Sequence, residues 1–112
     1  MSFKLTVRHG SRVDRESFDD LEAAIAAARR AAEQVRSEGP LDSVSVLREY
    51  ASADRVAARL EISRGAFLRS VSAGVDVMGD GSLVAFAGGV RRRPLQTAGD
   101  DSAFEAVRRE LG

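Results

Sequence analysis

A chain of 112 residues that is 44% hydrophobic and 30% charged has the composition of a globular domain, which argues against disorder and against a membrane-embedded fold. Seventeen basic and 17 acidic side chains give a formal charge of zero, which counts against a dedicated electrostatic binder of nucleic acid or anionic lipid. With no cysteine there is no disulfide framework and no thiolate chemistry, so we expect a cytoplasmic protein. All basic residues except Lys4 are arginine, a bias that we interpret as the result of GC-rich coding.

An antiparallel hairpin is predicted at the start of the chain. Residues 3–7 alternate apolar and polar side chains, which is the period of a half-buried strand. His9-Gly10-Ser11 follows as a turn. A three-residue loop there would pair Val7 with Val13 and make residues 12–16 a short partner strand.

A long helix is predicted next, from Ser17 to about Arg36. Ser17 is a favourable N-cap, and Asp19 and Asp20 would lie in the first turn, where the helix dipole favours anions. Apolar residues recur at steps of three and four and form one stripe: Phe18, Leu21, Ala24, Ile25, Ala28, Ala32 and Val35. Gly39-Pro40 ends the helix. Because much of the stripe is alanine, we expect close packing against a sheet.

Residues 43–50 and 54–62 both alternate apolar and polar side chains, and the short linker between them predicts an antiparallel hairpin. A competing interpretation makes residues 52–62 a short helix capped by Ser52, because alanine and arginine favour helices. We favour the strand. Alternation then resumes over residues 67–71 and leads into a further strand.

A second hairpin is predicted around Asp80-Gly81, which is among the strongest two-residue turn signals. A turn centred there places Val77 opposite Val84 and Val75 opposite Phe86, so that one face carries two apolar cross-strand pairs. The opposite face would carry further apolar residues, namely Met78, Leu83 and Ala85. Both faces of this hairpin are therefore predicted to be apolar.

The segment after this hairpin contains the candidate interaction residues. Gly88 and Gly89 weaken a strand and mark a bend or the close approach of another backbone, and we favour a bend over the alanine-rich helix. Arg91, Arg92 and Arg93 could contact phosphates, helped by Arg108 and Arg109 near the end of the chain. The other interpretation, which we favour, is a solvated strand end whose charges discourage edge-to-edge pairing.

No catalytic, cofactor or metal site is predicted. An EF-hand loop that began at Asp76 would have Met78 and Ala87 where oxygen ligands are needed. No lysine follows Gly81 as a phosphate-binding loop requires, and the dinucleotide fingerprint lacks its third glycine and its helix. With one histidine and no cysteine the usual catalytic triads are absent, so we expect a protein that is not an enzyme and holds no cofactor.

A short helix is predicted over residues 100–111, capped by Asp100 or Asp101. Its core-facing residues would be Phe104, Val107 and Leu111. The element order then predicts an α+β fold. In this fold a single, mostly antiparallel sheet of about five or six strands carries the long helix of the N-terminal half and the short C-terminal helix on one face. We expect residues 1–112 to form one such domain.

Two helices cannot cover both faces of such a sheet, and pairing with a second copy would hide an exposed apolar face. We therefore predict a small non-catalytic module that acts through a protein partner or homo-oligomerisation, away from membranes.

The alternative is nucleic-acid binding through Arg91, Arg92 and Arg93. The order helix–strand–strand–strand–helix resembles that of the double-stranded-RNA-binding domain. In that family basic residues at the start of the last helix contact phosphates. Asp100-Asp101 stands at that position here and would repel them, so we do not favour this alternative.

Overall fold

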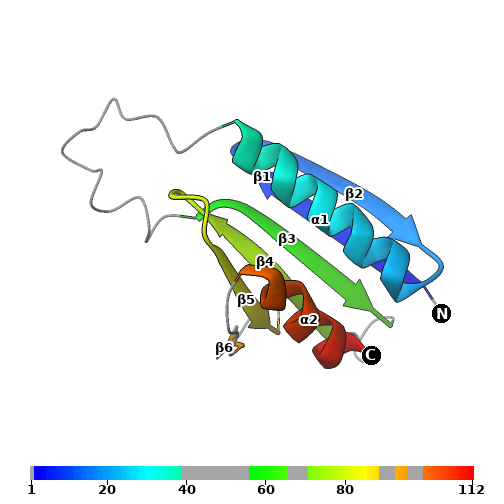
Figure 1. The fold of residues 1–112 in the computed structure, drawn as a ribbon. Helices are drawn as coiled ribbons and strands as arrows, with labels where there is room; N and C mark the ends of the chain where they lie inside the picture. The colour runs from blue at the N-terminus through cyan, green and yellow to red at the C-terminus, as the bar shows by residue number, and fades with distance from the viewer. Residues whose placement is uncertain (1, 39–55, 66–70, 89–92, 96–99) are drawn as a thin grey trace.

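The computed structural model describes residues 2–38, 56–65, 71–88, 93–95 and 100–112 (Figure 1). This part of the chain forms six strands and two helices. In chain order they are β1 (Phe3–His9), β2 (Arg12–Phe18), α1 (Leu21–Ser37), β3 (Val56–Arg64), β4 (Val71–Met78), β5 (Leu83–Ala87), β6 (Arg93–Pro94) and α2 (Asp100–Leu111).

The strands form one sheet in the order β2-β1-β3-β4-β5-β6, and every neighbouring pair is antiparallel. Helix α1 connects β2 to β3, so the chain crosses over β1 on its way (Figure 1). Both helices lie on the same face of the sheet, α1 mainly over β1 and β3 and α2 over β4 and β5. The predicted α+β fold is confirmed. We call the face without helices the open face.

The core lies between the helices and the sheet. It is formed by the apolar stripes predicted for the helices and by one face of the strands. The alanine stripe of α1 is buried at Ala24, Ala28 and Ala32, whose small side chains let the helix lie close to the strands. From the sheet come Phe3, Leu5, Ala58, Leu60, Ile62, Ala73, Val75, Val77, Leu83 and Ala85, and from α2 come Phe104, Val107 and Leu111. Among the residues that the structure describes, no polar or charged residue is buried as a whole.

Helix α1 begins later than predicted. Ser17 and Phe18 belong to β2, where Phe18 lies opposite Phe3, so Ser17 is not the N-cap. Asp20 takes that role in an extended conformation, and its Oδ1 accepts a hydrogen bond of 2.7 Å from the Ala23 backbone N–H. The helix ends at Ser37, and Gly39-Pro40 lies outside the described residues.

Replacing Asp20 with alanine should destabilise the protein by about 1 kcal/mol, because the Ala23 N–H then loses its acceptor. Urea unfolding monitored by circular dichroism measures this loss. Asp20→Asn keeps a side-chain oxygen at the same place and should cost much less. An equal loss in both variants would mean that the carboxylate charge, and not the cap, is what matters.

The first hairpin is shifted by one residue from the prediction. Its loop has two residues, Gly10-Ser11, with Gly10 at a φ of 64°, and Val7 therefore lies opposite Asp14 and not opposite Val13. The left-handed glycine makes a two-residue turn possible, so a third loop residue is not needed. As a consequence Val13 points to the open face and is exposed, whereas Asp14 lies on the helix side of β2.

The segment of residues 56–62 is a strand, as favoured, and the helical alternative is wrong there. Strand β3 has β1 on one side and β4 on the other, so it is a central strand of the sheet. The pairing of β3 with β4 shifts register between Val56 and Ala58, and Val56 is exposed whereas Ala58 is buried. The predicted strand at residues 43–50 lies outside the described residues.

The second hairpin is also shifted by one residue. Its loop has three residues, Gly79-Asp80-Gly81, closed by a bond of 2.9 Å from the Gly81 N–H to the Met78 carbonyl and one of 2.8 Å from the Met78 N–H to the Ser82 carbonyl. Gly81 has a φ of 90°, as expected for a turn whose third residue is left-handed and forms a bulge. The observed pairs are Val77 with Leu83, Val75 with Ala85 and Gly74 with Phe86.

This register changes which face of β5 meets the core. Leu83 and Ala85 are buried under the helices, whereas Val84 and Phe86 belong to the open face. The predicted apolar cluster of Val75 and Val77 with Val84 and Phe86 is therefore wrong. Its place is taken by Val75 and Val77 with Leu83 and Ala85.

The Asp80 side chain closes the loop, since its Oδ1 accepts hydrogen bonds from the Ser82 N–H (2.9 Å) and hydroxyl (2.6 Å). These bonds, chiefly the one from the hydroxyl, lower the pKa of Asp80 from its ordinary value of 3.8. A lowered pKa in the folded state means that the carboxylate stabilises the fold above the unfolded pKa. This contribution is lost as the pH falls through the lower, folded value.

In Ser82→Ala we expect the pKa of Asp80 to move back towards 3.8, though not all the way because the backbone donor remains. Titration of the carboxyl carbon by NMR measures this pKa directly. Ser82→Thr retains the hydroxyl and is the control. An unchanged pKa in Ser82→Ala would show that the hydroxyl does not stabilise the carboxylate.

Helix α2 matches its predicted range, and Phe104, Val107 and Leu111 are buried as predicted. Charged side chains join it to α1, among them the Arg29–Glu105 ion pair of 3.8 Å. Arg108 donates to both carboxylate oxygens of Glu22 at 2.8 Å, and the Arg29 guanidinium lies 4.8 Å from the centre of the Phe104 ring. The side chains of Asp100 and Asp101, the predicted caps, lie outside the described residues.

Candidate interaction surface

Gly88 is the first of the predicted interaction residues that the structure describes. It follows the last residue of β5 with a φ of 89°, and its N–H donates a bond of 2.8 Å to the Ser72 carbonyl. A side chain rarely adopts this left-handed conformation, so a glycine is needed where β5 ends. Gly89, Arg91 and Arg92 lie outside the described residues.

Arg93 is the member of the arginine triplet that the structure places. It begins β6, opposite Ala87, and its Nη2 lies 3.0 Å from the Glu110 carboxylate of α2. This side chain is exposed, yet its charge is matched by an acid. Arg108, a second basic residue predicted to support a phosphate contact, is paired with Glu22 and Glu105. Arg93 and Arg108 are therefore both engaged in contacts within the chain.

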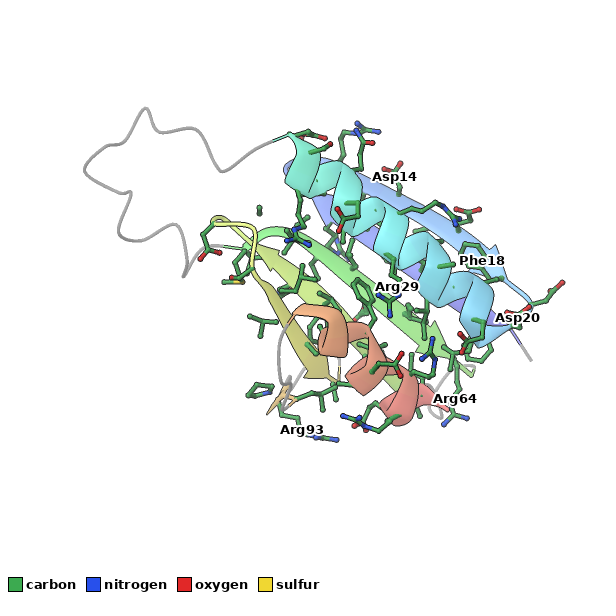
Figure 2. All side chains as sticks on the ribbon, in the orientation of Figure 1. Asp14, Phe18, Asp20, Arg29, Arg64 and Arg93 are labelled. Carbon is green, nitrogen blue, oxygen red and sulfur yellow. The ribbon has the colours of Figure 1, made fainter. Side chains whose placement is uncertain are left out.

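A groove that the sequence did not predict lies between α1 and the strands β1 and β2. It has a volume of about 440 Å³, and we call it the β2 groove. Apolar side chains form its floor: Leu5, Val7, Ala27, Ala31 and Val35. Polar side chains form its rim: His9, Arg12, Asp14, Glu16, Arg30, Gln34 and Glu38. Figure 2 shows Asp14 on β2 beside α1.

The groove exists because α1 lies mainly over β1 and β3 and, on the helix side of β2, leaves every residue before Phe18 exposed. The register of the first hairpin decides which residues occupy that side, namely Arg12, Asp14 and Glu16. The pair Gly10-Ser11 is itself a signal for a two-residue hairpin loop and could have revealed this register.

The charges on the rim are partly matched. His9 Nε2 and Glu38 Oε1 lie 4.0 Å apart, and Arg12 Nη2 lies 3.7 Å from Asp14 Oδ2. Glu16 and Arg30 have no ion-pair partner in the described part of the chain. An apolar floor with a rim of both signs suits a chain segment that carries apolar and charged side chains in turn.

Strand β2 borders this groove and is also an edge of the sheet. Its first six residues are exposed and Phe18 is half-buried. In a two-residue hairpin the flanking residues, here His9 and Arg12, form a bonded pair, and bonded pairs then alternate along the strands. By this rule every second residue turns its backbone N–H and C=O away from β1: Val13, Arg15 and Ser17. Such an unpaired row is a template for another strand.

On the open face of the sheet, side chains of neighbouring strands pack together around Phe86. Arg59 donates two hydrogen bonds to Asp76, of 2.7 Å and 3.1 Å, and its guanidinium lies 5.6 Å from the centre of the Phe86 ring. The bond to Asp76 raises the pKa of Arg59 above its ordinary value. Phe86 in turn covers Gly74 on the neighbouring strand. This cluster has a structural role, because its polar groups are satisfied by one another.

The described residues were also searched for a metal site and for a membrane-spanning helix. They contain no group of three or more His, Cys, Asp or Glu side chains placed to hold a metal ion. Neither α1 nor α2 is long and apolar enough to cross a lipid bilayer. A scan against protein-family models finds no match for the chain, and searches of curated proteins and of solved structures find no significant similarity.

Proposed function

We propose that this protein is a small non-catalytic interaction module that binds a protein partner by adding a strand to the free edge of β2. The observation that carries this proposal is the seven-residue edge strand that borders the β2 groove and whose first six residues are exposed. In strand addition the backbone hydrogen bonds supply affinity, and pockets for alternate side chains supply specificity. Strand β2 offers the backbone groups, and the groove lies on one side of it. The absence of cysteine is consistent with action in the cytoplasm.

The alternative, nucleic-acid binding through Arg91, Arg92 and Arg93, has weaker support. Arg93 already lies in an ion pair with Glu110, and the formal charge of the whole chain is zero. Release of counterions by unpaired cations drives most binding to nucleic-acid phosphates, so an arginine held by an acid contributes little.

The proposal is tested by comparing the wild-type protein with Arg15→Pro as baits in a native lysate, each with and without nuclease. The Arg15 N–H points outward by the alternation rule, so proline removes a donor needed by an added strand without breaking a bond to β1. We expect the wild type to retain a protein partner in the presence of nuclease, and Arg15→Pro to lose it. Arg109→Ala, an exposed change on α2, should retain the partner and is the control.

Two results would count against this function. Capture that is equal for wild type and Arg15→Pro would show that the edge of β2 is not the binding surface. Capture that disappears on nuclease treatment would favour nucleic acid instead. Far-UV circular dichroism of Arg15→Pro should match that of the wild type, so that loss of binding is not loss of fold.

A further inference from the structure

The order of charges along β2 points to a second copy of this chain as the partner, an inference that rests on the proposed function. We propose that two β2 strands pair antiparallel about a two-fold axis at Asp14. Arg12 of each copy then lies opposite Glu16 of the other. The two six-stranded sheets become one continuous sheet, with the same surface of each copy forming the interface, as is usual in homodimers.

Backbone geometry restricts the possible registers. The outward residues of one copy must face outward residues of the other, because these carry the free N–H and C=O groups. Allowed registers therefore differ in steps of two residues. In each of them the residues on the helix side of one copy meet residues on the helix side of the other, so that all four helices lie on one face of the joined sheet.

Charge then selects among the allowed registers. With the axis at Asp14, Arg12 faces Glu16 twice, and the exposed Val13 faces the stem of Arg15 twice. With the axis at Arg15, Asp14 faces Glu16 twice and Arg15 faces itself. Like charges directly opposite one another are destabilising, and opposite charges are favourable.

The remaining registers are also inferior. An axis at Glu16 brings the two Glu16 side chains together and pairs no opposite charges. An axis at Val13 pairs Arg12 with Asp14 twice but leaves three residues of each strand to form the ladder. An axis at Ser17 also leaves three residues and pairs no opposite charges. The axis at Asp14 is therefore the register that combines a five-residue ladder with attractive pairs.

The axis at Asp14 also brings two Asp14 carboxylates near one another. Each already lies 3.7 Å from Arg12 of its own chain, and Arg30 on the rim of the groove supplies a further unmatched cation in each copy. These arginines offset the repulsion at the axis. The interface is thus an exposed network of charges, so the dimer should weaken as salt screens them.

Pairing also changes the β2 groove. Each copy contributes one groove on the same side of the joined sheet, next to the shared β2 strands. The two grooves then adjoin across the axis and form one channel, walled by α1 of each copy and floored in part by the two Val7 side chains. The second copy therefore completes a recess that a single chain leaves open on one side.

The test uses charge reversal in the purified full chain, with mass measured by sedimentation velocity over a range of concentrations. We expect the wild type to dimerise reversibly, and Arg12→Glu and Glu16→Arg to weaken dimerisation by about tenfold or more each, since each creates two repulsive pairs. The double variant R12E/E16R restores opposite charges and should dimerise again. Arg15→Pro should be monomeric whatever the charges are.

The inference is overturned by a wild type that stays monomeric at every concentration, or by a double variant that is no better than either single one. Both residues are exposed, so the variants should fold, and matching far-UV circular dichroism checks this. A monomeric wild type whose bait still captures a prey, lost in Arg15→Pro, refutes the dimer and supports strand addition to another protein. A monomer that captures nothing refutes both proposals.

Discussion

Replacing Gly74 with alanine is expected to destabilise the fold severely. A Cβ at this position would lie 2.0 Å from the backbone oxygen of Leu60 and 2.9 Å from the Cα of Glu61, both on the neighbouring strand β3. It would also lie 2.7 Å from Cζ of Phe86. Because β3 is held on both sides by β1 and β4, its backbone cannot move away without breaking the centre of the sheet. We expect a loss of more than about 3 kcal/mol, at the upper end of the range for overpacked cores.

Gly10→Ala is the matched control, because nothing lies within 4 Å of a Cβ at Gly10. That variant experiences the strain of a left-handed φ of 64° and should cost about 1–2 kcal/mol. Soluble yield and urea unfolding measure both variants. If Gly74→Ala were no more damaging than Gly10→Ala, the close approach of β3 and β4 at this glycine would be wrong. Adding Phe86→Leu should not rescue Gly74→Ala, since the closest atom belongs to the backbone.

Phe86→Ala is the second substitution with a large expected effect. The ring is 4% exposed although it lies on the open face, where it covers Gly74 and carries the Arg59 guanidinium above it. Removing it uncovers the β3–β4 backbone and leaves Arg59 without its aromatic surface. We expect a loss of about 3–5 kcal/mol, as for other buried phenylalanines.

Phe86→Leu separates volume from aromatic character. Leucine fills most of the space but offers no π face to Arg59, a contact worth about 1 kcal/mol. Its cost in urea unfolding should therefore be less than half that of Phe86→Ala. A cost for Phe86→Ala below about 1 kcal/mol, typical of surface positions, would contradict the burial of the ring on the open face.

The helices and strands were predictable from the sequence wherever the apolar residues follow a single regular spacing. The stripe of α1, the apolar face of α2 and the alternation of β3 each match one regular structure. These segments lie close to the predicted ranges. The start of α1 was missed because Ser17 and Asp20 are both good caps, and the choice between them depends on the pairing of Phe18 with Phe3.

The hairpin registers were not predictable from alternation, and the reason is visible in β5. Residues 83–87 are all apolar, so they place apolar side chains opposite Val75 and Val77 in either register. The register of this hairpin is then determined by the conformation of the loop. A two-residue loop needs a positive φ at both Asp80 and Gly81, whereas a three-residue loop needs it only at its third residue, Gly81, so the loop length depends on the conformation of Asp80.

The β2 groove depends on relations between distant segments that no local pattern contains. It requires that α1 cross over β1 to reach β3 and that β2 remain at the edge. The ion pair of Arg93 with Glu110 likewise joins β6 to α2. A sequence shows that these side chains are charged, but the element order in space decides which of them meet.

The place of β1 between β2 and β3 has a consequence for the order of folding events. The β1–β2 and β4–β5 hairpins join residues that are near in sequence, so each can form early at little entropic cost. The β1–β3 ladder, in which Leu5 meets Ile62, joins segments from opposite ends of the long α1 connection. Formation of the β1–β3 ladder is the most non-local step in the central sheet, and we expect it to limit the folding rate.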